Sequence, residues 1–69
     1  MFIESQSRAR LEALESWREA ARLASDRWHG FIGAEPELRG FAFASYVAAL
    51  DSEEAAAADL AQFAHATAA

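Results

Sequence analysis

The residue types that could support chemistry gather in one short stretch, DRWHGF, which runs from Asp26 to Phe31. Asp26 and His29 are three positions apart, so a helix would carry their carboxylate and imidazole on one side. Helical bundles hold di-iron centres with this spacing, usually as Glu-x-x-His supported by further inward glutamates. In this sequence no second carboxylate is placed to face the same level of a helical bundle, and Trp28 occupies the position that would point into the bundle. We therefore expect no metal or other cofactor at this stretch.

The other polar residues form no catalytic set. The six serines have no histidine and acid arranged beside them for nucleophilic catalysis. The acids between residues 51 and 59 are interpreted as exposed residues at a helix start and not as a sheltered acid–base pair. Gly30 and Gly33 lack the preceding strand and the further glycines of a phosphate-binding loop. We expect no enzyme activity and no small-molecule substrate.

Charge and cysteine content exclude other classes of site. The chain has no cysteine, and its two histidines, His29 and His65, are 36 positions apart, which argues against a closed zinc site. Residues 35–69 carry six acids against Arg39 alone and so hold the whole net charge of −5. Without a basic stripe we expect no nucleic-acid binding. The same asymmetry supports an alternative function, an acidic inhibitor or nucleic-acid mimic that binds a basic partner surface.

Length makes partner chains the expected source of extra stability. Sixty-nine residues form at most one domain, and a domain of this size buries only about 60% of its unfolded surface. Disulfides and thiolate metal sites are excluded, so a partner subunit remains. No apolar run is long enough to span a membrane, and MFIESQSR lacks the features of a signal peptide. We expect a cytoplasmic protein, and the arginine-only basic residues are typical of a GC-rich bacterial genome.

The elements that must position these residues begin with a helix over about 4–29. Its apolar residues recur at steps of three and four, as one helix face requires. In heptad terms, Leu14, Ala21 and Trp28 take the a positions, and Trp17, Ala24 and Phe31 take the d positions. His29 suits the negative end of this helix, and Gly30 or Gly33 is predicted to end it.

A turn over 30–35 should lead into a second helix over about 36–64, with a frayed tail at 65–69. Pro36 suits the first turn of that helix. Asp51 and Glu54 fit a capping box, so the helix is possibly split at 51–52 into two, which would give a compact three-helix monomer. We favour one continuous helix, in which Ala57, Leu60, Ala61 and Ala64 prolong a stripe from Val47 and Leu50.

These elements predict an all-α, antiparallel helical hairpin that dimerises into a four-helix bundle. The segment 38–50 is apolar over more than one face, so one face can meet the first helix and the other needs a partner. The predicted interface residues are the apolar side chains of both helices: Leu14, Trp17, Ala21, Trp28, Phe31, Phe41, Phe43, Tyr46, Val47, Leu50, Leu60 and Phe63.

The sequence Trp28-His29-Gly30, placed between two predicted helices, resembles the Trp-x-Gly of the small WXG-type substrates of type VII secretion. That resemblance implies a secreted helical hairpin that dimerises. The chain is shorter than is usual for that family. Its Tyr-x-x-x-Asp/Glu export signal is also missing, because Tyr46 is followed four positions later by Leu50 and Asp51 comes one position too late.

The sequence favours a non-enzymatic helical protein–protein interaction module, present as a homodimer or as a small subunit of a larger assembly. Its partner is then a second copy of itself or another protein subunit, bound through the apolar helix faces. The acidic inhibitor is the first alternative. A WXG-like secreted hairpin and a ferritin-like metal-binding bundle are further alternatives.

Overall fold

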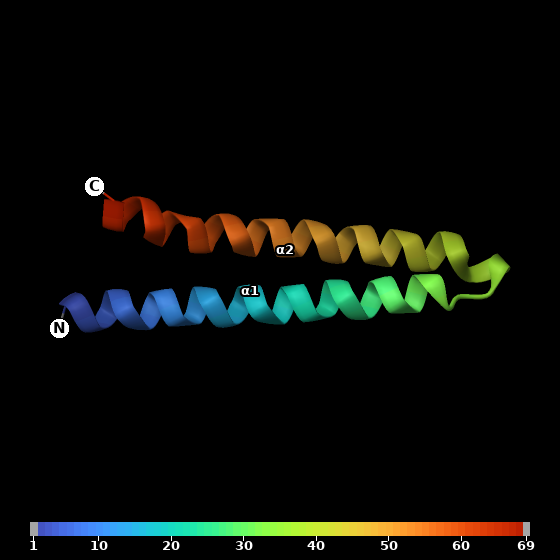
Figure 1. The fold of residues 1–69 in the computed structure, drawn as a ribbon, viewed down its shortest axis with the longest axis horizontal. Helices are drawn as coiled ribbons and strands as arrows, with labels where there is room; N and C mark the ends of the chain where they lie inside the picture. Colours follow the sequence, from blue (N-terminus) through green and yellow to red (C-terminus); the bar gives the residue numbers. More distant parts are fainter. Residues whose placement is uncertain (1, 69) are drawn as a thin grey trace.

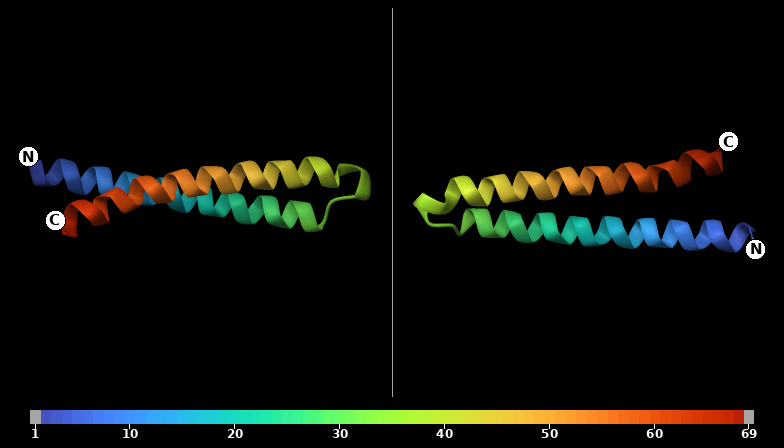
Figure 2. Two further views of the ribbon diagram at one scale, coloured as in Figure 1. Left: turned by 90° about the horizontal axis from the view of Figure 1, so that it is seen from above. Right: turned by 180° about the vertical axis from the view of Figure 1, so that it is seen from behind.

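The chain is an antiparallel hairpin of two long helices, which confirms the predicted fold class (Figure 1). The computed structural model describes the backbone of residues 2–68 and the side-chain surroundings of residues 7–64. Helix α1 spans Phe2–Ile32, a short 3-10 helix η1 spans Pro36–Leu38, and α2 spans Arg39–Ala68. The helices lie side by side along their lengths, with both chain ends at one end of the molecule and the turn at the other (Figure 2). The molecule measures 53 × 18 × 12 Å.

Helix α1 meets α2 along the stripe that its spacing predicts. Ala24 is buried, and Leu14, Trp17, Ala21 and Phe31 are half-buried. These positions alternate between steps of three and four, which keeps one narrow face toward a partner helix. Alanine and long unbranched side chains dominate the rest of α1, and such residues favour the helical backbone.

Helix α2 presents its own regular stripe to α1, but it is not the stripe that the sequence suggested. Its inward-facing residues, buried or half-buried at steps of four and three, are Ala42, Tyr46, Ala49, Glu53, Ala56, Leu60 and Phe63. Of the residues that were expected to share one stripe, Ala57 and Leu60 are half-buried, and Val47, Leu50, Ala61 and Ala64 are exposed. The apolar surface of α2 is wide enough to support either choice.

The turn closes through hydrogen bonds that continue the two helices. The Gly33 N–H donates to the His29 carbonyl and the Ala34 N–H donates to the Phe31 carbonyl, both at 3.2 Å. Pro36 then starts η1, where its missing N–H costs nothing, and the Leu38 N–H donates to the Glu35 carbonyl at 2.9 Å. None of the glycines in the described part of the chain has a positive φ.

The observed bounds differ from the expected ones at three places. Helix α1 passes through Gly30 and ends at Ile32, because nothing in the packing requires a left-handed residue at Gly30. The 3-10 helix η1 occupies the positions where the second helix was expected to start, and α2 reaches Ala68. Residues 51–54 lie within α2 without a break, so these acids act as ordinary helix residues. Neither helix of the described chain combines the length and apolar character that a bilayer crossing requires.

Replacing Gly30 by alanine should stabilise the hairpin. Gly30 is helical, and an added Cβ there would meet no atom within 4 Å, so alanine removes a flexible residue without a clash. We expect a gain of about 0.5–1 kcal/mol, seen as a rise of roughly 2–8 °C in Tm at fixed protein concentration. Gly40→Ala is the matched second variant, because Gly40 is also helical and an added Cβ there would meet no atom within 4 Å, so it should give a similar gain. Destabilisation by Gly30→Ala would contradict the helical assignment at this residue.

Candidate functional site

Four aromatic side chains join the two helices next to the turn. The ring centroids of Trp28 and Tyr46 lie 5.2 Å apart, and those of Phe31 and Phe43 lie 5.3 Å apart. Trp28 also contacts Phe31 at 5.6 Å, and Phe43 contacts Tyr46 at 6.4 Å. All four pairs are tilted, an arrangement that aromatic quadrupoles favour. This cluster fixes the relative height of the helices, because it pairs residue 28 with 46 and residue 31 with 43.

Away from the rings, the buried residues between the helices are small, while Leu14, Trp17, Leu60 and Phe63 are half-buried along the same seam. The buried residues of the described chain are Ala24, Ala49 and Ala56, which are 5%, 4% and 9% exposed. No large side chain there is fully buried. An alanine seam lets two helices approach closely, but it removes little apolar surface from water. The larger apolar side chains therefore lie along the edges of the seam.

These exposed side chains divide between two sides of the hairpin. At 100° per residue, Phe43, Val47 and Leu50 lie on one flank of α2, roughly a third of a turn from the seam. Trp28 and Ile32 flank the seam of α1 on that same side, since α2 runs antiparallel to α1. We call this surface the Val47 face and define it by its exposed residues Trp28, Ile32, Phe43, Val47 and Leu50.

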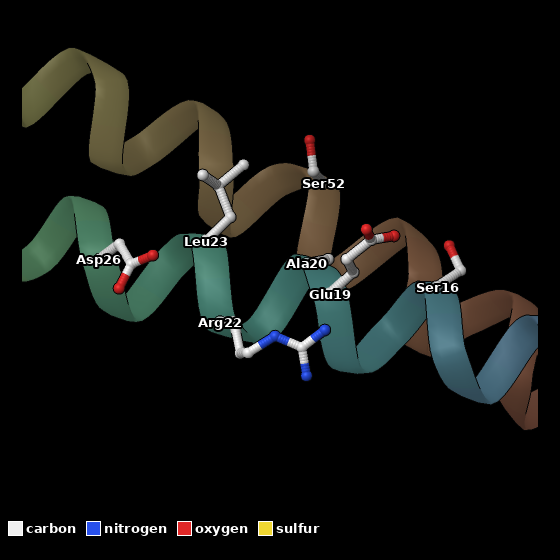
Figure 3. Close-up of a pocket in the computed structure, with 7 residues that line it drawn as sticks. All are labelled: Ser16, Glu19, Ala20, Arg22, Leu23, Asp26 and Ser52. Atoms are coloured by element: carbon white, nitrogen blue, oxygen red, sulfur yellow. The ribbon is translucent and has the colours of Figure 1, made fainter.

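The opposite side of the hairpin is more polar. It carries two exposed large apolar residues, Leu23 on α1 and Phe41 on α2, and we call it the Leu23 face. A shallow groove of about 550 Å³ runs along it. The groove is lined by Ser16, Glu19, Ala20, Arg22, Leu23, Asp26 and Ser52. Figure 3 shows that Leu23 reaches toward α2, whereas the guanidinium of Arg22 points away from it.

The groove does not assemble a reactive centre. Its one residue from α2, Ser52, donates its hydroxyl to the carbonyl of Ala48 at 3.2 Å, a bond within its own helix. No histidine lies among the groove residues. A second hollow, of about 230 Å³, lies near the open end of α1 and is lined by Ser7, Arg10, Leu11 and Leu14. Both hollows can accept a side chain, and neither arranges a nucleophile with a base.

The stretch DRWHGF lies inside the last turns of α1 and not between the helices. This removes the placement on which the resemblance to WXG-type hairpins depends. His29 is exposed, and its Nδ1 is 2.8 Å from the carbonyl of Ser25, one turn earlier in α1. Asp26, three positions before His29 on the same side of the helix, lines the groove. Among the described side chains, no group of three or more histidines and carboxylates is placed to hold a metal ion; the side chain of His65 lies outside them.

The acids of α2 are spread around the helix. Glu53 is half-buried in the seam, while Asp51, Glu54 and Asp59 are exposed. At 100° per residue these four carboxylates point in four different directions. A basic partner surface would therefore meet one or two of them at a time.

The predicted interface residues separate into two groups. Those that lie along the seam and are half-buried within the hairpin are Leu14, Trp17, Ala21, Phe31, Tyr46, Leu60 and Phe63. Those left exposed are Trp28, Phe41, Phe43, Val47 and Leu50. The predicted list omitted the exposed residues Leu11, Leu23, Ile32 and Leu38. Ile32 lies past the expected end of the first helix, and Leu11 and Leu23 lie outside the heptad stripe. Leu38 belongs to the predicted apolar segment 38–50 but was not included in the list.

Comparisons of the chain with protein-family models, with curated proteins and with solved structures find no match.

The alanine seam should not tolerate a large side chain. Ala49 is 4% exposed and faces α1, so Ala49→Leu forces the helices apart beside the aromatic cluster. We expect a loss of about 1–3 kcal/mol, measured by thermal unfolding at fixed protein concentration. The neighbouring Ala48 is exposed, and Ala48→Leu is the matched control, with an expected change within about 0.5 kcal/mol. Equal effects of the two substitutions would contradict the register of α2.

Proposed function

We propose that this protein is a non-enzymatic helical interaction module whose partner is a second copy of the same chain. The proposal rests on one observation, the large solvent-accessible surface area of the hairpin. The hairpin exposes 5529 Å², whereas a compact monomer of its 7.5 kDa mass exposes roughly 4,200 Å². The excess is larger than the roughly 800 Å² that each partner buries in a standard protein interface.

The shape of the molecule supports the same proposal. Its radius of gyration is 15.9 Å, compared with about 11 Å for a compact domain of this length. Two helices can cover each other on one side only, so the flanks of both helices stay open to solvent. Association of two hairpins into a four-helix bundle gives every helix two neighbours and a shared core.

The identity of the exposed residues supports association by apolar contact. Trp28, Phe43, Val47 and Leu50 are large, and each is more than a third exposed. Aromatic and aliphatic anchors of this kind contribute most of the binding energy in protein interfaces. The alternative of an acidic mimic has no comparable structural support, because the carboxylates of α2 do not gather on one face.

The solution mass tests this proposal. At micromolar concentration we expect twice the 7.5 kDa mass of the chain, with a Tm that rises with protein concentration. The association should survive about 1 M salt, where charges are screened beyond roughly 3 Å. A stably folded monomer at these concentrations would contradict the proposal. A complex that forms with basic proteins alone and dissociates in salt would favour the acidic mimic.

A further inference from the structure

The two faces of the hairpin differ in what they offer a second hairpin. On the Val47 face, five large apolar residues lie within the half of the molecule next to the turn. The Leu23 face has Leu23 and Phe41 as its exposed large apolar residues, separated by a polar groove that contains Glu19 and Asp26. Burying the Leu23 face would remove those carboxylates from water, which is costly unless a partner charge compensates for them. The Val47 face is the better contact surface.

The position of the Val47 face along the hairpin limits how two copies can meet. Two hairpins related by a two-fold axis along their length have their turns at the same end, so the apolar half of each faces the apolar half of the other. With the axis across the length, the turns lie at opposite ends. The apolar half of one copy then faces the half of its partner next to the chain ends, where Leu11 is the one exposed large apolar residue among the described side chains.

Charge favours the arrangement with both turns at one end. That arrangement places α1 of one copy against α2 of the other, whereas the opposite one places each helix against its own equivalent. Helix α1 carries five acids and five arginines, and α2 carries four acids against one arginine. Contact between two copies of α2 would therefore bring like charges together, while contact between α1 and α2 does not.

Specific charges also match across the proposed contact. The ring pairs 28 with 46 and 31 with 43 place Arg18 and Arg22 of α1 level with residues near 56 and 52 of α2. Glu54 lies between those heights. Arg18 and Glu54 are exposed and, at 100° per residue, lie on the same side of the hairpin as the Val47 face, whereas Arg22 lines the groove of the Leu23 face. A lengthwise two-fold axis preserves height, so Glu54 of one copy lies within one helical turn of the height of Arg18 of the other.

We propose that two copies of this chain pack through the Val47 face with both turns at the same end, and that Arg18 of each copy borders Glu54 of the other. This inference rests on the self-association proposed above and adds the face and the direction of packing. The contact is isologous, so each residue of the face occurs twice in the dimer.

The face is tested by matched charge insertions. Leu50→Glu places a carboxylate in the proposed contact, and we expect it to raise the dimer Kd by about a hundredfold or more. Phe41→Glu is the control. Phe41 is 82% exposed, against 38% for Leu50, so association through general exposed apolar area would depend more on Phe41. We expect Phe41→Glu to change the Kd by less than about threefold. The reverse ranking would assign the contact to the Leu23 face and overturn the inference.

Exchanging the charges at residues 18 and 54 tests the proposed contact independently of whether the Leu50→Glu variant folds. Glu54→Arg should weaken the dimer, because it brings an arginine next to Arg18 of the other copy. The double variant Arg18→Glu with Glu54→Arg should recover part of that loss. Equal weakening in the single and the double variant would contradict the pairing of α1 with α2.

The direction of packing is tested by spin labels. The chain has no cysteine, so Glu37→Cys in η1 and Ser7→Cys near the open end each provide one labelling site per copy. Both labels should give intermolecular distances well under half of the 53 Å length of the hairpin. Distances approaching that length would show turns at opposite ends, which overturns the packing but leaves the self-association intact. A monomeric protein, with no intermolecular distance, would overturn both.

Discussion

The alanine seam is the contact on which the rest of this structure depends. Ala24, Ala49 and Ala56 allow two helices to lie close together over most of their length. The same small side chains form almost no buried apolar core, because an alanine removes little surface from water. A hairpin joined in this way has a defined shape and register but lacks the apolar burial that a domain of this size needs.

The aromatic cluster next to the turn compensates for part of that deficit. Trp28 and Phe31 from α1 meet Phe43 and Tyr46 from α2, and these rings supply the largest contacts between the helices. The cluster also connects the fold to the proposed interaction. Trp28 and Phe43 contact the other rings and still contribute exposed surface to the Val47 face. One set of side chains thus fixes the hairpin and borders the surface that a second copy would cover.

The stretch DRWHGF illustrates how a chemically suggestive sequence can be structural. Trp28 contacts Tyr46 of α2, whereas Asp26 and His29 are exposed neighbours at i and i+3 that make separate contacts. Asp26 borders the groove, Trp28 joins the ring cluster, and His29 lies within hydrogen-bonding distance of a carbonyl of its own helix. A helix separates consecutive residues by 100°, and three neighbours can therefore serve three unrelated contacts.

The sequence by itself determined the helical hairpin and the inward face of α1. A strict alternation of three and four, with no proline and no glycine before Gly30, allows α1 one apolar stripe, and the structure uses it. The inward face of α2 was decided only by the tertiary structure. Its residues 38–50 are apolar on several sides, so periodicity alone cannot rank one face above another. Packing against α1 covers a face on which Ala42, Ala49 and Ala56 alternate with the larger Tyr46, Leu60 and Phe63, and it leaves Val47 and Leu50 outside. The candidate interaction surface consists of the apolar residues of α2 that do not face α1. It could be identified only from the structure, which shows the side of α2 that packs against α1.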